Sequence, residues 1–338
     1  MAVAQAPQRE AAASLRAIPH LDAAAYVRHP LHRADCLWSE KNCYVDVWIE
    51  LIHALGQEPL AALPFTCAID FEGDQWTFFK PPHEELRELY GLDVQELNVW
   101  RPLLEHARDY LAVGKLISTE ADAFWLPDTA GTDYRRKHTK STIILAELDL
   151  AGERLGYFHN AGYFLLEGED FARTFRIGLP PDPQFMPLFA EVIRTDRLIH
   201  LPAERLRDAS LSLWRKHLAR VPGTNPVERF GQRLGTELTA MHGRGLDHYH
   251  AWAFATVRQL GSAFELAAAN LRWLEAGGLT GLGTPVEAFE LIASHSKTLI
   301  LKGARAVNTR RSFNGDEMLA AMTDAWQRGI SSLAATLG

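Results

Sequence analysis

The stretch WSEKNCYVDVWIELIHALG (Trp38–Gly56) decides the fold that we predict for this chain. Only Asp46, Glu50 and His53 form a polar stripe, so other parts of the chain must cover most of this helix. Ser39 or Asn42 can cap its start, and the final glycine can end it in the left-handed conformation. The pattern predicts a buried helix in the middle of a domain. Its apolar residues recur at helical spacing and are Tyr44, Val47, Trp48, Leu51, Ile52 and Leu55.

Cys43 lies in the first turn of this predicted helix. Unpaired N–H groups and the positive end of the helix dipole stabilise a thiolate at such a position, and the thiolate is the nucleophilic form of cysteine. We therefore take Cys43 as the candidate nucleophile. The alternative is a small buried hydrophobic side chain, which is the usual state of a free cysteine.

The composition is typical of a soluble globular protein, with 338 residues, 47% hydrophobic and 23% charged. A net charge of −7 gives no basic footprint for nucleic acid. No stretch reaches the roughly 18 apolar residues that a membrane span needs. The three cysteines are too few for a disulfide framework, so we expect a reducing, cytoplasmic location without contact to a membrane.

Two lobes fit this length, an α+β lobe over residues 19–180 and an all-α lobe over 181–338. Residues 1–18 are rich in alanine and glutamine, and we expect them to be frayed or disordered. The boundary follows Pro180, in the run Pro180–Pro183. The first lobe is predicted to hold a hairpin at 64–71 and 75–79, helices at 84–90 and 99–113, and extended segments at 116–120, 123–128, 141–149 and 154–160. The second is predicted to hold helices at 187–194, 202–220, 226–241, 246–275, 285–311 and 316–337.

The predicted helix 246–275 carries more aromatic surface than a solvent-facing helix tolerates. We expect this surface to pack on the first lobe or on a second subunit, so a homodimer is a candidate state.

A thiol nucleophile needs a base and a third group that orients the base. His138 precedes the strand 141–149, and Asn160 ends the next strand. A cysteine on a helix, then a histidine, then an asparagine is the papain-like order, and it gives Cys43, His138 and Asn160 as the candidate triad. The competing base is His159.

The pairing of the two strands constrains this triad. If Asp149 pairs with Arg154, His138 lies opposite about residue 165, five positions or ~16 Å from Asn160. A bulge or a longer turn would have to close that gap. Asp128 or Asp133 can orient a base instead.

Four strings of the first lobe, followed by His248–Thr256, resemble the bacterial DUF1839 family. More distantly, the arrangement is similar to the papain-like acyltransferases of butirosin biosynthesis. That similarity implies transfer of an aminoacyl group from the phosphopantetheine thioester of a carrier protein to a small amine. It implies no cofactor beyond the partner's phosphopantetheine. The four strings are Glu40–Asp46, Asp70–Phe79, Trp125–Arg136 and Gly156–Tyr163.

In this reading Cys43 attacks the thioester and His138 acts as base and then as acid. The substrate-binding candidates are Arg135, Arg136, Lys137, Lys140 and Asn42, of which the four basic residues suit a phosphate or an acidic carrier protein. A solvated charge run is the alternative for those four.

Three other readings stay open. The first is a cysteine hydrolase, amidase or thioesterase, and the second is a protein that only binds a carrier protein. The third is zinc chemistry through His29, His32 and Cys36, whose spacing does not match common zinc sites, so we predict no metal.

Overall fold

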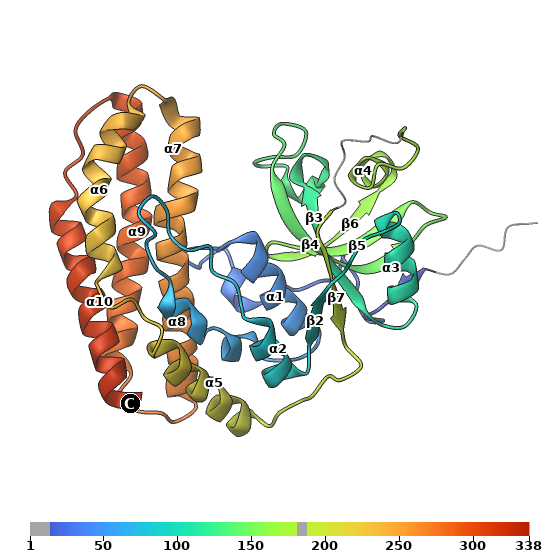
Figure 1. The fold of residues 1–338 in the computed structure, drawn as a ribbon, viewed down its shortest axis with the longest axis horizontal. Coiled ribbons are helices and arrows are strands. Elements are labelled where there is room, and N and C mark those ends of the chain that lie inside the picture. Colours follow the sequence, from blue (N-terminus) through green and yellow to red (C-terminus); the bar gives the residue numbers. More distant parts are fainter. Residues whose placement is uncertain (1–13, 181–187, 338) are drawn as a thin grey trace, which may run out of the picture. The chain divides into compact units, whose positions relative to one another are not determined.

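The computed structural model describes residues 14–180 and 188–337. The chain forms two compact units, which we call the first unit (described residues of 1–28, 46–55 and 91–198) and the second unit (described residues of 29–45, 56–90 and 199–338). Each unit therefore combines segments that are distant in sequence (Figure 1). The predicted α+β class is confirmed.

The described residues of the first unit form one antiparallel sheet of seven strands (Figure 1). The strand order is β2-β7-β3-β4-β5-β6, and β1 pairs with β4 on the edge opposite β5. Asp149 pairs with Arg154, which is the register considered above for the triad. The strands are β1 (Leu15–Arg16), β2 (Asp93–Glu96), β3 (Leu116–Asp122), β4 (Lys140–Asp149), β5 (Arg154–His159), β6 (Gly162–Glu167) and β7 (Ala190–Arg194).

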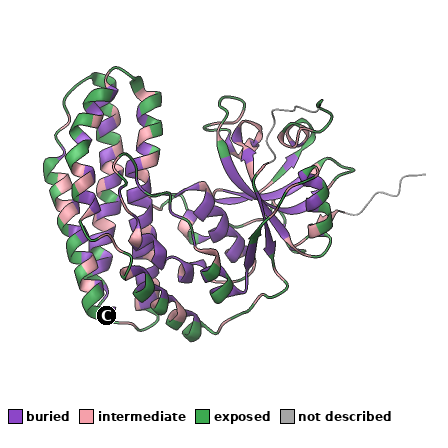
Figure 2. Ribbon diagram, viewed as in Figure 1, coloured by how far each residue is buried: buried purple, intermediate pink, exposed green. Residues whose placement is uncertain are grey.

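Different elements meet the two faces of this sheet. On one face, β3, β4 and β5 share a hydrophobic core with α3 (Leu103–Leu111) and α4 (Gly168–Thr174). On the other face, the Phe158 ring contacts the ring of Tyr26, whose hydroxyl donates to the Glu50 carboxylate of α1 (Cys43–Ala54). Figure 2 shows the central strands as almost continuously buried, which is expected for a sheet covered on both faces.

Helix α1 confirms the opening prediction. It begins at Cys43, Asn42 caps it, and Gly56 follows its end with a left-handed φ of 71°. Val47 and Leu51 are fully buried, as the periodicity predicts. The polar stripe differs from the prediction, because Asp46 and Glu50 are also fully buried.

Three predicted extended or helical segments are wrong. Residues 64–71 begin with a 3₁₀ helix, Pro64–Ala68, and the hairpin is reduced to a single bridge between Phe71 and Trp76. Residues 123–128 also form 3₁₀ turns, because the Asp122 side chain caps the first turn by accepting from the Phe124 N–H. Residues 190–194 form β7 rather than a helix, since both of its edges find partner strands in β2 and β3.

Two predictions concern residues in or next to the segments that the structure does not describe. The predicted linker Pro180–Pro183 and the start of the 187–194 segment lie mostly outside the described residues. Residues 1–13 of the N-terminus that we predict to be frayed are also outside the described residues. For the residues that follow, the prediction is wrong, because Leu15–Arg16 form β1. Ser14 and Arg16 donate to the buried Glu147 carboxylate of β4, which explains why β1 is ordered.

The second unit contains most of the helices. Among the described residues, α6 to α10 lie side by side (Figure 1). The helices predicted at 226–241 and 316–337 agree with the structure, and the others differ by a few residues at their ends. The helices of this unit are α2 (His83–Tyr90), α5 (Ala203–Leu218), α6 (Pro226–Met241), α7 (Gly245–Ala253), α8 (Gln259–Ala276), α9 (Gly283–Thr309) and α10 (Asp316–Leu337).

The predicted helix 246–275 is interrupted by a π-helical turn, Phe254–Arg258. This turn frees carbonyl groups for other partners, and the Ala255 carbonyl accepts from the Trp76 N–H. The aromatic surface of this helix packs inside the second unit, where Trp252 stacks on Phe230 and Phe264 contacts Phe289. The helix also contacts residues 59–68, and it accepts a hydrogen bond from Trp76, so the expected packing on the lobe predicted at 19–180 is seen for these residues.

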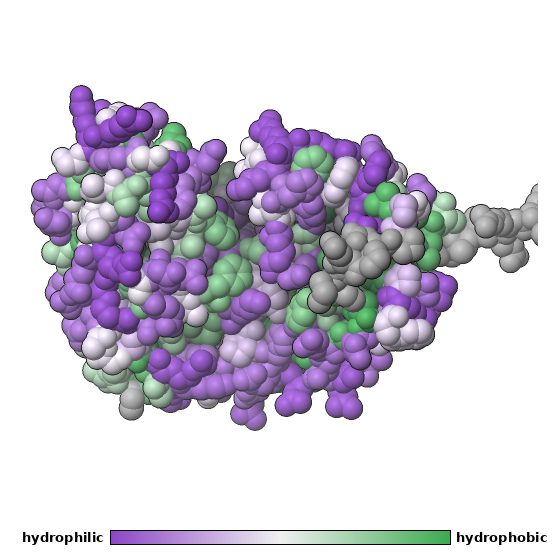
Figure 3. Space-filling model, turned by 45° about the horizontal axis from the view of Figure 1, so that its top comes forward, coloured by the Kyte–Doolittle hydropathy of each residue, from purple (hydrophilic) through white to green (hydrophobic). Residues whose placement is uncertain are grey.

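No helix among the described residues is long and apolar enough to cross a membrane. Hydrophilic side chains cover most of the face drawn in Figure 3, and apolar groups gather there in a few places.

Candidate functional site

Cys43 is the first residue of α1 and is partly exposed. The Asn42 side-chain oxygen accepts from the Tyr44 and Val45 N–H groups at 3.1 and 2.9 Å. The Asn42 amide nitrogen donates to the Phe79 carbonyl at 3.1 Å. Asn42 therefore fixes the first turn of α1 to the second unit. The sequence predicts Asn42 as a substrate-binding candidate, and the structure shows its side chain as a buried N-cap.

The loop before Cys43 is held by α8 and the π-helical turn. Lys41 is fully buried and its ammonium lies 3.3 Å from the Glu265 carboxylate. The Arg258 guanidinium donates to the Lys41 and Glu40 carbonyls at 3.2 and 2.8 Å. These contacts leave the thiol-bearing residue little freedom to move relative to the rest of the second unit.

A histidine that the sequence reasoning missed contacts Tyr44, the residue that follows Cys43, in the same unit. His83 Nε2 is 2.8 Å from the hydroxyl of Tyr44, the residue that follows the cysteine. The Lys80 ammonium lies 4.4 Å from the centre of the same tyrosine ring. The chain therefore brings a second imidazole and a cation to the start of α1.

His138, the predicted base, belongs to the first unit. Its Nδ1 lies 2.6 Å from Asp122 Oδ2, and its ring stacks on Phe124 with centroids 4.4 Å apart. The side chain is nevertheless 70% exposed. A carboxylate thus fixes one nitrogen of an imidazole whose other edge faces solvent, which is the geometry of an oriented general base.

Asn160, the predicted orienting residue, occupies the two-residue turn between β5 and β6. Its φ of 43° is left-handed, and asparagine adopts this conformation more readily than most residues. A β-bulge between Leu145 and Glu147 shifts the pairing by one residue, so that Ile143 lies opposite His159. Asn160 is then about four positions along the ladder from His138, and the turn itself accounts for an asparagine here.

His159, the competing base, is buried in a hydrogen-bonded cluster with Asp128. His159 Nε2 lies 2.6 Å from Ser141 Oγ, and its Nδ1 lies 2.5 Å from Asp128 Oδ2. The Tyr157 hydroxyl donates to the other Asp128 oxygen. Burial, and then the Asp128 charge, raise the pKa of Tyr157 well above its ordinary value, so the phenol remains a donor.

The faces of the sheet separate His159 from α1. Phe158 points to the face that contacts Tyr26 and α1, and successive side chains of a strand point to opposite faces. His159 therefore points to the face covered by α3 and α4, together with Tyr157. The Asp128 cluster joins a 3₁₀ turn to β5, and we read it as the support of the segment that carries Phe124.

Three of the other predicted residues, Asp133, Arg135 and Lys140, have structural partners. Asp133 accepts from the Thr139 hydroxyl at 2.8 Å. Arg135 pairs with Asp170, and Lys140 pairs with Glu120 at 2.9 Å. Of the four basic residues, Arg136 and Lys137 are exposed and have no ion-pair partner among the described residues.

The predicted triad is therefore distributed over the two units. Cys43 belongs to the second, whereas His138 and Asn160 belong to the first. The structure pairs His138 with Asp122, which the sequence reasoning missed. The neighbouring strands β3 and β4 could have revealed it, because Asp122 ends one strand and pairs with Lys140 at the start of the other.

No group of three or more His, Cys, Asp or Glu side chains within residues 14–180 and 188–337 is arranged to hold a metal ion. His29 Nδ1 accepts from the Leu31 N–H, His32 is fully buried, and the Cys36 thiol lies 3.2 Å from the Pro30 carbonyl oxygen. These contacts occupy the residues of the zinc alternative.

Fold and site together define an α+β protein whose antiparallel sheet carries two carboxylate-oriented imidazoles and whose buried helix begins with a partly exposed cysteine. The chain matches the DUF1839 N-terminal domain over residues 27–195 and the DUF1839 C-terminal domain over residues 203–335. It belongs to the DUF1839 family. No curated protein matches it.

Proposed function

We propose that this protein is a papain-like, cysteine-dependent acyltransferase in which Cys43 is the nucleophile and His138 the general base. Asp122, rather than Asn160, orients the imidazole. The observation that carries the proposal is the Asp122–His138 pair, whose 2.6 Å contact and exposed ring are what a base needs. The position of Cys43 at the start of a capped, buried helix supports its role as the thiolate.

The chemistry divides into two balanced steps. The Cys43 thiolate attacks the carbonyl carbon of a thioester, the substrate's sulfur leaves, and the protonated His138 gives that sulfur its proton. An amine then attacks the Cys43 thioester, His138 takes the proton of the amine, and the Cys43 sulfur leaves as thiolate. The first step exchanges one sulfur for another.

We further propose that the donor is an aminoacyl thioester of phosphopantetheine on a carrier protein, and that the acceptor is a small amine. The exposed Arg136 and Lys137 beside His138 support an anionic donor, because arginine and lysine bind phosphate and acidic surfaces. Arg135 and Lys140 contribute less to this proposal, since each already has a carboxylate partner.

The test incubates the full chain with the alanyl thioester of N-acetylcysteamine, a small mimic of the pantetheine end, and measures the intact mass. We expect one added alanyl group on the wild type and on the matched control Cys36→Ala, whose cysteine is also partly exposed, and none on Cys43→Ala. Labelling of Cys43→Ala at the wild-type rate would refute the proposed nucleophile.

Two further variants identify the base. His138→Ala should slow the acylation of Cys43 by about 10²-fold, the lower range of general-base catalysis, whereas His83→Ala should leave it within about twofold. The reverse result would assign the base to His83, which hydrogen bonds to Tyr44 in the same unit as Cys43.

Added glycine amide separates transfer from the alternatives. Alanyl-glycine amide as the product supports a transferase, whereas free alanine despite excess amine indicates a hydrolase. A chain that binds an aminoacylated carrier protein but never gains mass would be a docking protein with a structural Cys43.

A further inference from the structure

A cavity of about 770 Å³ lies in the first unit, away from His138. Its walls are the start of α3 with the preceding residues 99–102, the β4–β5 turn and residues 174–180, with Leu188 beside them. The β4–β5 turn is one end of the ten-residue strand β4, and His138 precedes the other end. At ~3.4 Å per residue the two places are about 30 Å apart, so the cavity is separate from the imidazole sites.

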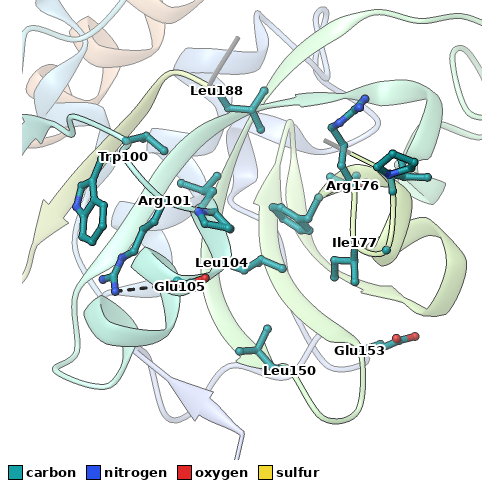
Figure 4. Close-up of a pocket in the computed structure, with 17 residues that line it drawn as sticks. Trp100, Arg101, Leu104, Glu105, Leu150, Glu153, Arg176, Ile177 and Leu188 are labelled. Atoms are coloured by element: carbon teal, nitrogen blue, oxygen red, sulfur yellow. Dashed lines mark ion pairs between the residues drawn. The ribbon is translucent and has the colours of Figure 1, made fainter. Parts of the chain in front are cut away.

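Apolar side chains and one ion pair share this cavity. In Figure 4, Leu104 and Ile177 lie near the middle of the view and Leu150 lies below them. The Arg101–Glu105 ion pair lies beside Leu104, while the charged ends of Arg176 and Glu153 point away from the centre. Eleven of the seventeen lining residues are apolar, and the charged ones are two arginines and two glutamates, which cancel.

Large apolar side chains are left exposed around this one cavity. Trp100 is 76% exposed, and Leu150 and Ile177 are each 41% exposed. Exposed apolar groups are ordinary when scattered, but a set that lines one concavity of this volume is typical of a binding site for a small molecule.

Two buried polar atoms of the lining residues have no hydrogen-bond partner among the described residues. They are Thr174 Oγ1 and Arg101 Nε. The rest of the Arg101 guanidinium is engaged, since one Nη donates to Asp109 at 2.7 Å and another lies 3.9 Å from Glu105. An uncharged acceptor on a ligand that reached either donor would satisfy it without adding a net charge.

We propose that this cavity binds a small uncharged molecule with an aliphatic chain and one hydrogen-bond acceptor, of the class of fatty alcohols and fatty esters. The chain lies among Leu104, Leu150 and Ile177, and the acceptor meets Thr174 or Arg101. A fatty carboxylate fits less well, because the lining has no excess positive charge and Asp109 already pairs with Arg101.

The experiment measures binding to the full chain of 1-aminoanthracene, an uncharged fluorescent probe, and its displacement by 1-decanol and by decanoate. We expect saturable probe binding that decanol reverses at a concentration at least about tenfold lower than decanoate. Failure of the probe to bind would overturn the site, and equal displacement by decanoate would overturn the uncharged ligand class.

The variants Leu150→Glu and Ile177→Glu place a carboxylate on the cavity wall. Because both side chains are substantially exposed, we expect the fold to persist, with thermal unfolding within a few degrees of wild type, and probe affinity to fall at least about tenfold. Leu301→Glu is the matched control, since Leu301 is 64% exposed on α9 of the second unit. Equal loss of affinity in Leu301→Glu would place the probe elsewhere and refute the proposal.

Acylation of Cys43 separates this inference from the proposed function. Ile177→Glu should leave the rate of Cys43 acylation unchanged while it removes probe binding. A parallel loss of both would mean that the cavity belongs to the acyl-transfer site and that the inferred independent ligand is wrong.

Discussion

Asp122 and His138 are sixteen residues apart in sequence, and their contact is short because β3 and β4 pair at this point. A carboxylate that accepts from Nδ1 fixes the ring and stabilises the imidazolium that forms during proton transfer. An amide in the same place keeps the shape but removes the charge. Replacing the Asp122 carboxylate with an amide therefore tests whether its charge, and not only its shape, is needed to orient His138.

We predict that Asp122→Asn lowers the rate of Cys43 acylation by at least about tenfold, since general-base catalysis contributes about 10²- to 10⁴-fold. Asn160→Asp, at a position that the turn geometry explains, should leave the rate within about twofold. The measurement is the acylation rate against pH for each variant. If Asn160→Asp acylated Cys43 slowly while Asp122→Asn kept the wild-type rate, Asn160 would be the residue that orients His138.

The Asp128 cluster offers a second residue-scale prediction. Asp128→Ala leaves the buried His159 and Tyr157 without their shared acceptor, and an unpaired buried polar group costs about 1–3 kcal/mol. We expect a loss of this size in the free energy of unfolding measured with urea. Asp133→Ala, which removes the acceptor of Thr139 in the same segment, is the control and should cost less. Equal losses in the two variants would show that the Asp128 cluster stabilises the fold no more than the contact of Asp133 with Thr139 does.

At the scale of elements, α1 depends on its cap. Asn42 accepts from two N–H groups of the first turn, and Asn225 makes the same cap on α6 with the Val227 and Glu228 N–H groups. Both side-chain nitrogens also donate to a backbone carbonyl, Phe79 for one and Thr323 for the other. The chain thus contains a matched pair of caps, only one of which adjoins a cysteine.

We predict that Asn42→Ala and Asn225→Ala each lower the free energy of unfolding by about 1 kcal/mol, the usual cost of a lost N-cap. Only Asn42→Ala should also slow the alkylation of Cys43 by iodoacetamide, because it loosens the turn that presents the thiol. Equal alkylation rates in the two variants would contradict the link between the cap and the thiol.

The elements that the sequence could predict are those whose periodicity is long. Helix α1, the strands β4 and β5 and the helices of the second unit extend over enough residues for the apolar repeat to show. β7 has five residues and owes its conformation to partners on both edges, which no local pattern reveals. The π-helical turn is similar, since its freed carbonyl is used by Trp76, far away in sequence.

The same reason limits the site. Cys43 and His138 could be singled out from their residue types and from the elements they adjoin. His83 could not, because its role depends on a contact across the second unit. Asp122 could be found only by first pairing β3 with β4, which places it beside His138. Asn160 fits the expected order of a triad. Its left-handed φ, however, explains an asparagine at this turn without any catalytic role.

At the scale of the whole molecule, each unit contains a buried carboxylate held by cations. In the first unit, burial would raise the pKa of Glu147, but hydrogen bonds from Ser14 and Arg154 and the charge of Arg16 outweigh burial and lower it. In the second unit, burial would raise the pKa of Glu85, but the hydrogen bonds with His217 and Lys216 outweigh burial and lower it.

A carboxyl group whose pKa is lower in the folded than in the unfolded chain stabilises the fold above its unfolded pKa of about 4.5. This contribution is lost as the pH falls through the lower, folded pKa. We therefore predict that these two groups leave the free energy of unfolding unchanged between about pH 6 and 7, where both are ionised. Below about pH 4.5 they should lower it as they become protonated. Urea unfolding at a series of pH values measures this dependence.

Glu85→Gln and Glu147→Gln assign the loss to the two units. Each should lower stability at neutral pH by about 1–3 kcal/mol, because a charged acceptor is replaced in a buried network, and each should weaken the fall at acid pH. Hydrogen exchange should rise in α2 and α5 for Glu85→Gln and in β4 and β5 for Glu147→Gln, since these elements hold the partners. The exposed Glu72→Gln is the control and should change neither exchange pattern. A uniform rise throughout the chain in both variants would show that the two units unfold as one, and a steep acid dependence that survives in both would show that other carboxylates control it.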